Sequence, residues 1–336
     1  MMRWCVIGAG GIADRRTIPA ILSDKESTLV AVMDRVPAVA EAVGKKYGVP
    51  YFTDEAEMLS SVSADAVYIG TPVFCHKHQI ELAASHGKHV FVEKPIAMNA
   101  KEGAEILAFC REKGVALTVG YMMKHHSLHE KAKTLIRDGA IGNVNCVRAQ
   151  FTCWYPDIPG AWRQDPALGG GGALMDLGVH CIELIEYLLD DEIEDVEGML
   201  SHRTFSYAVE DGAVVVFRTK GGVLGHIDVA FNIPDAASES KLELYGAAGY
   251  LQAKGTLAQE EVGVLTHLYA PQGDYDAAQS RVTHEPVTYL PEGENLYLRQ
   301  IRLFRETVAK GEFDYFYAER AVQVQSVIDK IYEKNK

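Results

Sequence analysis

The chain has 336 residues, of which 48% are hydrophobic and 24% are charged, and its formal net charge is −13. This composition indicates a globular protein long enough for two domains and excludes extensive disorder. The negative charge, without a basic stripe to offset it, argues against a nucleic-acid partner because phosphate backbones would be repelled.

Cysteine usage and hydropathy indicate the cellular compartment of the chain. The six cysteines have irregular spacing and form no CxxC pair, which predicts free thiols in a reducing cytoplasm. No apolar run approaches the ~20 residues that a membrane-spanning helix needs, so no membrane association is expected. The first strand is expected to start at about Arg3, which leaves no room for a signal peptide.

The first third of the chain alternates short apolar runs with helical segments. The expected strands are RWCVIGAG, TLVAVMD, DAVYIGTP, KHVFVEKP and ALTVGYM. Runs of this length with helices between them are typical of a parallel sheet covered on both faces, so the pattern predicts a doubly wound Rossmann domain over residues 1–120. Pro19 is expected to end or kink the first helical segment near Thr17.

A glycine-rich turn follows the first predicted strand. In VIGAGGIADR, Gly8 permits a tight turn, Gly10 lets backbone amides approach a pyrophosphate, and Ala13 permits close packing of helix on strand. Asp34 closes the second strand, where a carboxylate can accept both hydroxyls of an adenosine ribose. The neighbouring Arg35 could instead accommodate a 2′-phosphate. The pattern therefore predicts NAD as the cofactor and leaves NADP open.

HVFVEKPIA, residues 89–97, ends a buried strand on two charges and a proline. The carboxyl ends of such strands lie beside the nicotinamide, which would make Lys94 a cation at the reaction centre. There it can stabilise a developing alkoxide and orient it while hydride leaves carbon. Pro95 restricts Lys94 to extended geometry. The alternative is a solvated loop lysine, which the position at the strand end disfavours.

The pattern changes after about residue 121. Strands linked by glycine-containing turns are expected in NCVRAQFTCWY, GAVVVFRTKGGVLGHIDVAFNI and SKLELYGAAGYLQAKG. They predict a second α/β domain over residues 121–336, with an open, largely antiparallel mixed sheet. One face of that sheet is expected to meet solvent, a ligand or another subunit. Two amphipathic helices close the chain.

GGGGALMDLGVHCIELIEYLL, residues 169–189, predicts a helix that carries chemistry. Asp176 and His180 are four residues apart and share one face, so the carboxylate can orient the imidazole that takes the hydroxyl proton. A structural histidine with a carboxylate at the helix dipole is the alternative, and a metal site that includes Glu183 is disfavoured. The glycines indicate close backbone approach to a ligand or a flexible linker. The expected core stripe comprises Leu174, Leu177, Cys181, Leu184, Ile185 and Leu188.

Together GAGGIA, TPVFCH, EKP, GYMMKHH, AWR and GGGGALMDLGVH resemble the Gfo/Idh/MocA family of glucose–fructose oxidoreductase, inositol dehydrogenase and rhizopine catabolism proteins. The resemblance extends over essentially the whole chain, although residues 200–290 match mainly in strand pattern. It implies a Rossmann domain followed by an α/β domain with an open mixed sheet, often used for oligomerisation. It also implies pyridine-nucleotide oxidoreduction of sugars, cyclitols or related polyols, by a homodimer or homotetramer.

The resemblance assigns roles by position. Lys94 matches the catalytic lysine, His180 the catalytic histidine and Asp176 its acidic partner. Residues implied to contact the substrate are Lys94, Tyr121, Lys124, Asp176 and His180, where Lys124 replaces the usual arginine and its planar fork. The implied cofactor site comprises Gly8, Gly10, Gly11, Ile12, Ala13, Asp34, Arg35, Thr71, Pro72, His76, Glu93, Lys94, Trp162 and Arg163.

Further features follow from the same resemblance. Val73 stands where the family usually has an asparagine, which removes one polar contact to the nucleotide. The Lys94–Pro95 peptide is implied to be cis. The cluster of His125, His126 and His129 is interpreted as pocket rim and helix surface, because family members need no zinc. No metal is expected.

Three functions are compatible with these residues. The leading prediction is an NAD(P)-dependent dehydrogenase or reductase acting on a small polyhydroxylated substrate. The second is glycoside cleavage with a recycled NAD, and the third is a non-catalytic nucleotide-binding sensor, which has no need of Lys94, Asp176 and His180 together. Substrate specificity is expected to depend on the strand segments and on the region around Trp154, Tyr155 and Asp157.

Overall fold

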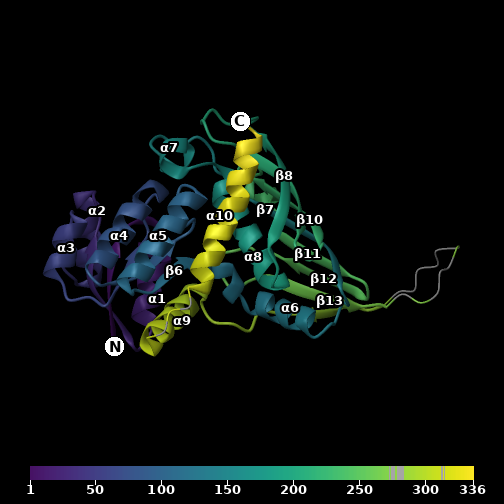
Figure 1. The fold of residues 1–336 in the computed structure, drawn as a ribbon, viewed down its shortest axis with the longest axis horizontal. Helices are drawn as coiled ribbons and strands as arrows, with labels where there is room; N and C mark the ends of the chain where they lie inside the picture. The colour runs from purple at the N-terminus through teal and green to yellow at the C-terminus, as the bar shows by residue number, and fades with distance from the viewer. Residues whose placement is uncertain (272, 274–276, 278–283, 312, 314) are drawn as a thin grey trace. The chain divides into compact units, whose positions relative to one another are not determined.

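The computed structural model describes residues 1–271, 273, 277, 284–311, 313 and 315–336 (Figure 1). The chain divides into two compact units, neither of which is continuous in sequence. The first unit comprises Met1–Tyr121, Asp165–Gly170 and Tyr297–Ser326. The second comprises Met122–Gln164, Gly171–Leu296 and Val327–Lys336.

The first unit contains a parallel sheet in the order β3-β2-β1-β4-β5-β6. Its strands are β1 Met2–Ile7, β2 Ser27–Met33, β3 Tyr51–Phe52, β4 Ala66–Ile69, β5 His89–Glu93 and β6 Leu117–Gly120. Every strand pair recorded in it is parallel, which confirms the predicted Rossmann-type sheet. The edge strand β3 was not expected, because two residues produce no recognisable pattern.

Helices cover both faces of this sheet, as the continuous apolar strands require. They are α1 Ile18–Ser23, α2 Pro37–Tyr47, α3 Glu55–Ser61, α4 His76–Ser85, α5 Ala100–Lys113, α7 Pro166–Gly169, α9 Leu296–Lys310 and the first part of α10 Phe316–Lys334. A π-helical turn, Ala13–Thr17, precedes α1, whose first turn contains Pro19. The helical backbone continues through Thr17 and Ile18, so the predicted end of the segment near Thr17 is wrong and only the hydrogen-bonding pattern changes there, from π to α.

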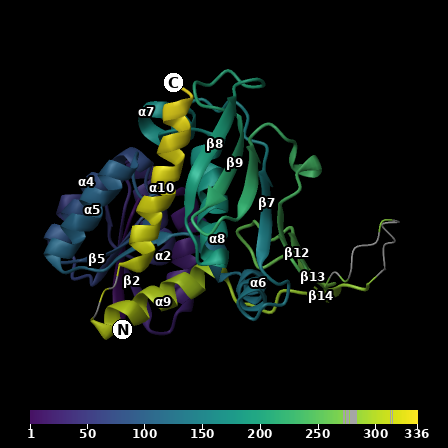
Figure 2. The ribbon, with the colours of Figure 1, turned by 45° about the vertical axis from the view of Figure 1, so that its right-hand side comes forward.

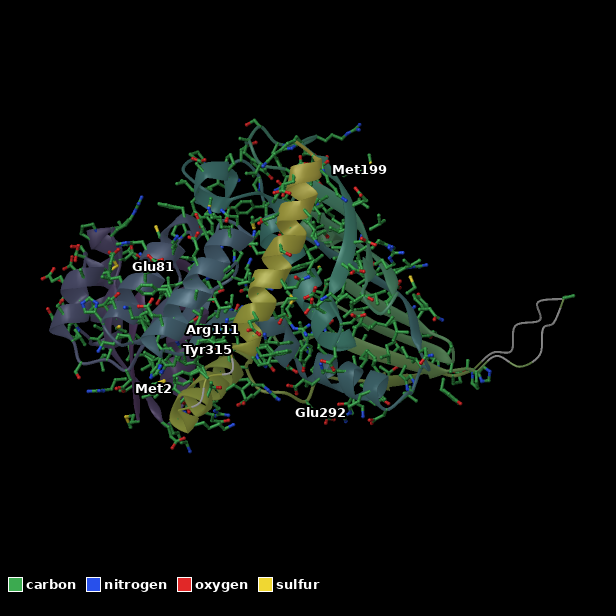
Figure 3. The ribbon with its side chains drawn as sticks, in the orientation of Figure 1. Met2, Glu81, Arg111, Met199, Glu292 and Tyr315 are labelled. Carbon is green, nitrogen blue, oxygen red and sulfur yellow. The ribbon has the colours of Figure 1, made fainter. Side chains whose placement is uncertain are left out.

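The chain returns to the first unit through α9. Phe304 of α9 lies 5.2 Å from Trp4 and 5.6 Å from Phe91 between ring centroids, so the helix closes the apolar core beside β1 and β5. Farther along, the Arg111 guanidinium lies 5.2 Å from the centroid of the Tyr315 ring (Figure 3). Burial of Trp4, Phe91 and Phe304 stabilises the packing of this segment.

The second unit contains a mixed sheet in the order β14-β13-β12-β11-β7-β10-β9-β8. Its strands are β7 Val144–Thr152, β8 Ile193–Ser201, β9 Gly212–Thr219, β10 Leu224–Ala230, β11 Lys241–Gly246, β12 Gly249–Lys254, β13 Val264–Tyr269 and β14 Val287–Tyr289. The β7–β10 pair is parallel and the other recorded pairs are antiparallel, which confirms a largely antiparallel mixed sheet. Sequence analysis missed β8, β13 and β14, which lie toward the two edges of this sheet.

Two helices of this unit, α6 Ser127–Arg137 and α8 Val179–Leu189, pack against the sheet (Figures 1 and 2). The predicted stripe on α8 is buried, but Ile182, Glu183 and Glu186 are buried as well. The helix is therefore buried on nearly all sides, whereas the sequence analysis predicted burial of one apolar face only. Within the described part of the chain, no helix is long and apolar enough to cross a membrane.

Candidate active site

The glycine-rich turn of the first unit is shaped by its backbone. Gly8 has φ +78°, and a Cβ there would lie 2.8 Å from Thr71 Cγ2. A Cβ on Gly10 would lie 3.0 Å from Val39 Cγ1, while Ala13 is fully buried beneath the turn. Larger side chains would close the approach to the backbone amides. The residues present therefore fit a bound pyrophosphate.

The Asp34 carboxylate is fixed at the end of β2. Its Oδ2 accepts a hydrogen bond of 3.2 Å from the Gly10 N–H, and its Oδ1 accepts one of 3.0 Å from the Val36 N–H. Each carboxylate oxygen retains a lone pair that can accept a ribose hydroxyl. The neighbouring Arg35 is exposed. This arrangement matches the acid expected at the adenosine end of a dinucleotide site.

His76 joins two loops of the first unit. Its Nδ1 lies 3.0 Å from the Pro95 carbonyl oxygen and its Nε2 lies 3.0 Å from the Thr71 carbonyl oxygen. Burial lowers the pKa of His76 to about 4, so the ring is neutral and donates to one carbonyl at a time. Because the ring is fully buried, its influence on a cofactor acts through the positions of the two loops.

Lys94 follows β5 directly, and its peptide bond to Pro95 is cis, as the family resemblance implied. The preceding Glu93 accepts a hydrogen bond of 2.7 Å from the buried Tyr68 hydroxyl. A Cβ on Gly120 of β6 would lie 3.2 Å from Glu93 Oε1. The two charges that end the strand therefore differ in role, since Glu93 is held by neighbouring strands while Lys94 begins the loop.

In the second unit, Asp176 lies in a π-helical turn, Leu174–Gly178, and His180 lies in the first turn of α8. Such turns are found frequently at functional sites. Arg163 donates from Nε to Asp176 Oδ1 at 3.2 Å, and its guanidinium carbon lies 4.2 Å from the Trp162 ring centroid. Arg163 of the predicted Trp-Arg pair thus contacts Asp176, the residue predicted to orient His180.

A buried ion pair joins this helix to the 3-10 turn Met122–His125. Lys124 Nζ donates to Glu183 Oε1 at 2.8 Å, and both side chains are almost completely enclosed. The charge of Lys124 is therefore compensated within the protein. Across the described segments, no group of three or more His, Cys, Asp or Glu side chains is arranged to hold a metal ion.

Two of the three histidines in the cluster, His126 and His129, are not at a surface, which corrects the sequence interpretation for them, while His125 is half-buried. His126 and His129 are fully buried. His129 contacts the Met123 carbonyl oxygen through Nδ1 at 2.7 Å and the Thr256 hydroxyl through Nε2 at 2.8 Å. His126 accepts from the Leu128 N–H and so caps α6. Their polar atoms find partners inside the fold, which the local sequence spacing could not reveal.

Sequence analysis missed the group that holds the glycine run before α8. Glu210 Oε1 accepts hydrogen bonds from the Gly172 N–H at 3.0 Å, the Leu174 N–H at 2.9 Å and the Tyr332 hydroxyl at 2.8 Å. A Cβ on Gly172 would lie only 2.0 Å from the Glu210 carbonyl oxygen. The glycine is therefore required for close backbone approach. The acidic pair directly before β9, Glu210 and Asp211, was the available sequence signal.

Family models match both parts of the chain. An oxidoreductase family model with an NAD-binding Rossmann fold matches residues 2–121, and the GFO/IDH/MocA C-terminal domain matches residues 129–252. The chain belongs to the Gfo/Idh/MocA family of oxidoreductases. The suspected membership is thus confirmed.

Members of the Gfo/Idh/MocA family with known reactions are similar over most of the chain. The dTDP-3,4-didehydro-2,6-dideoxy-alpha-D-glucose 3-reductase of Streptomyces antibioticus is 32% identical, covering 75% of each chain. The 1,5-anhydro-D-fructose reductase of Ensifer adhaerens is 30% identical, covering 79% of this chain and 80% of its own. The D-xylose 1-dehydrogenase (NADP(+)) 2 of Haloferax volcanii is 29% identical, covering 99% and 97%.

Solved structures of the Gfo/Idh/MocA family share the fold. A 3-ketoreductase from Actinomadura kijaniata, crystallised with NADP and TDP-benzene, is 25% identical with a TM-score of 0.85, covering 99% of this chain and 97% of its own. An aldose-aldose oxidoreductase from Caulobacter crescentus has a TM-score of 0.86 at 24% identity, covering 99% and 96%, and supports the fold alone. The chain is an oxidoreductase with an NAD(P)-binding Rossmann domain.

Proposed function

We propose that the chain transfers hydride between a nicotinamide cofactor and a hydroxyl-bearing or keto carbon of a sugar, cyclitol or related polyol. The observation that carries this proposal is the presence of Lys94, Asp176 and His180 together in an oxidoreductase whose relatives act on sugars. A non-catalytic sensor would have no need of all three groups.

The bound cofactor supplies the hydride acceptor or donor at nicotinamide C4. In the direction of oxidation, the substrate carbon loses a hydride, His180 takes the hydroxyl proton and a carbonyl forms. Lys94 donates a hydrogen bond to the same oxygen and stabilises its developing negative charge. Asp176 orients the imidazole and favours its protonated form. In reduction, His180 returns the proton to the oxygen.

We assign the nucleotide to residues 1–120 and the substrate to residues 121–336. Asp34 supports NAD as the preferred cofactor, because a carboxylate in hydrogen-bonding reach of the ribose repels a 2′-phosphate. Exposed Arg35 keeps NADP open, and one of the relatives described above is NADP-dependent by name. The remaining residues of the cofactor and substrate sets keep the roles that the family resemblance implies.

We also propose that the protein is a cytoplasmic homodimer or homotetramer that pairs through the open face of the second sheet. Val214 and Val216 of β9 are 53% and 54% exposed, and Met199 of β8, labelled in Figure 3, is 79% exposed. Contiguous apolar side chains on a sheet face favour burial against another subunit. All six cysteines are described and none forms a disulfide, which supports a reducing compartment.

A substrate panel tests the function. Aldoses, inositols, anhydrosugars and nucleotide sugars are incubated with NAD or NADP, and reduced nicotinamide is followed by its absorbance. The expected result is net reduction with at least one polyol. Release of a free sugar without net reduced nicotinamide would instead support the cofactor-recycling cleavage of glycosides. Light scattering of the same preparation measures the oligomeric state.

A further inference from the structure

Three rings in contact, Trp154, Phe205 and Tyr207, together with Tyr155, which joins them through its main-chain carbonyl, are called the aromatic strip. Trp154 packs edge-on against Phe205 with ring centroids 5.1 Å apart, and Phe205 stacks on Tyr207 at 5.3 Å. The Tyr207 hydroxyl donates to the Tyr155 carbonyl oxygen at 3.2 Å. Trp154 remains 42% exposed. The strip is therefore held together by its own contacts and exposes the Trp154 ring to solvent.

The strip is continuous with the residues assigned to catalysis. Arg163 interacts electrostatically with the Tyr155 hydroxyl, and its Nε donates to Asp176 Oδ1 at 3.2 Å. On its other side the Tyr155 ring lies 5.0 Å from the ring of buried Phe231, which follows β10. The strip thus extends outward from the acidic partner of His180 and is anchored on the sheet.

Carboxylates border the strip. Asp157 accepts a hydrogen bond of 2.7 Å from the Ser206 hydroxyl, and Asp235 accepts one of 2.9 Å from the Trp154 N–H. Both carboxylates retain acceptor capacity. An aromatic surface beside acceptors suits a pyranose ring, whose C–H face is apolar and whose hydroxyls donate. The same carboxylates repel a diphosphate.

We propose that the aromatic strip is a subsite for a second, uncharged sugar ring, so that the substrate is a glycoside or oligosaccharide rather than a nucleotide sugar. The inference rests on the proposed oxidoreductase function. In the second unit, the reacting ring is assigned to His180, and the second ring stacks on Trp154 and Phe205.

The test compares matched sugars in wild type, Trp154→Ala and Phe205→Ala. The pairs are glucose with cellobiose and maltose, galactose with lactose, and xylose with xylobiose. A charged nucleotide sugar, dTDP-glucose, is measured for comparison. We expect wild type to favour at least one disaccharide over its monosaccharide in kcat/KM. Either substitution should lower that ratio about tenfold, which corresponds to about 1.4 kcal/mol of binding free energy. Tyr269→Ala, an exposed aromatic on β13, is the matched control and should leave the ratio unchanged.

Three results would overturn the subsite. The first is an unchanged disaccharide-to-monosaccharide ratio of kcat/KM in both variants. The second is a loss of activity only toward dTDP-glucose. The third is a change of oligomeric state without a change in that ratio. If no sugar is oxidised or reduced by wild type, the proposed function fails. The subsite is then judged by calorimetric titration with the same disaccharides, in which Trp154→Ala should weaken binding about tenfold, and equal affinity for wild type and variant would refute it.

Discussion

The glycine-rich turn of the first unit and the helix α8 of the second, to which we assign nucleotide binding and catalysis, are built in different ways. In the first unit the predicted contacts are mostly backbone groups, which the small residues Gly8, Gly10 and Ala13 leave accessible. In the second, side chains are held by polar partners that are distant in sequence, such as Arg163 for Asp176 and Lys124 for Glu183. A site made of backbone is recognisable as a local motif, whereas one made of paired side chains depends on the fold.

The largest expected effect separates chemistry from nucleotide binding. Lys94→Ala and His180→Ala should each lower kcat by at least ~100-fold, because proton transfer and oxyanion stabilisation each contribute about that much or more. The dissociation constant of NAD, measured by calorimetry, should change little in both variants. Turnover close to wild type in either variant would remove the role assigned to that residue.

The buried ion pair of the second unit can be compared with an exposed one in the first. Lys124→Met leaves Glu183 charged and enclosed, which should cost about 3–5 kcal/mol of unfolding free energy. Lys45→Met breaks the exposed pair with Glu41 and should cost less than ~0.5 kcal/mol. Urea denaturation measures both values. The double variant Lys124→Met/Glu183→Leu should recover much of the loss, and similar costs for the two single variants would contradict the comparison.

Each unit also contains a buried neutral histidine whose protonation opposes folding. Burial lowers the pKa of His76 to about 4 and that of His129 to about 3, both below the ~6.5 of an unfolded chain. The unfolded state therefore binds the extra proton, and stability falls as pH drops below about 6.5, by up to ~1.4 kcal/mol per pH unit for each histidine. Well above pH 6.5 both histidines are neutral in the folded and in the unfolded state, so their protonation no longer lowers the stability.

Thermal denaturation between pH 4 and pH 7 measures that slope. His129→Gln should reduce the pH dependence of stability of the second unit, and His76→Gln should reduce that of the first. His78→Gln, which alters an exposed side chain on α4, should leave the slope unchanged. An equal slope in wild type and both buried-site variants would mean that other groups govern the acid dependence.

The smallest expected effect concerns the support of the glycine run. Tyr332→Phe removes one of the hydrogen bonds to Glu210, which should cost about 1 kcal/mol of unfolding free energy. Because Glu210 also holds Gly172 and Leu174, kcat should fall severalfold while NAD affinity is retained. Asn99→Ala, which removes the N-terminal cap of α5 in the first unit, should cost a similar free energy without lowering kcat. If kcat of Tyr332→Phe equals that of wild type, Glu210 contributes to folding stability and not to turnover.

Several features followed from local sequence alone. The alternation of apolar runs predicted the parallel sheet, since strands covered on both faces have no polar side. The G-x-G-x-x-A pattern predicted a turn that the φ of Gly8 and the packing around Gly10 bear out. Strand β8 was missed because its segment, IEDVEGMLS, carries acids that pair along a sheet edge and disturb the apolar alternation. The roles of the cofactor and substrate residues remain predictions.

What the sequence determined by itself was the family and the two kinds of sheet, because each depends on spacing within short segments. Only the tertiary structure decided that His126 and His129 are buried, that Lys124 is neutralised by Glu183, and that Glu210 supports the catalytic helix. The physical reason is that a buried polar group must find its partner wherever the fold provides one. Spacing along the chain does not encode that partner.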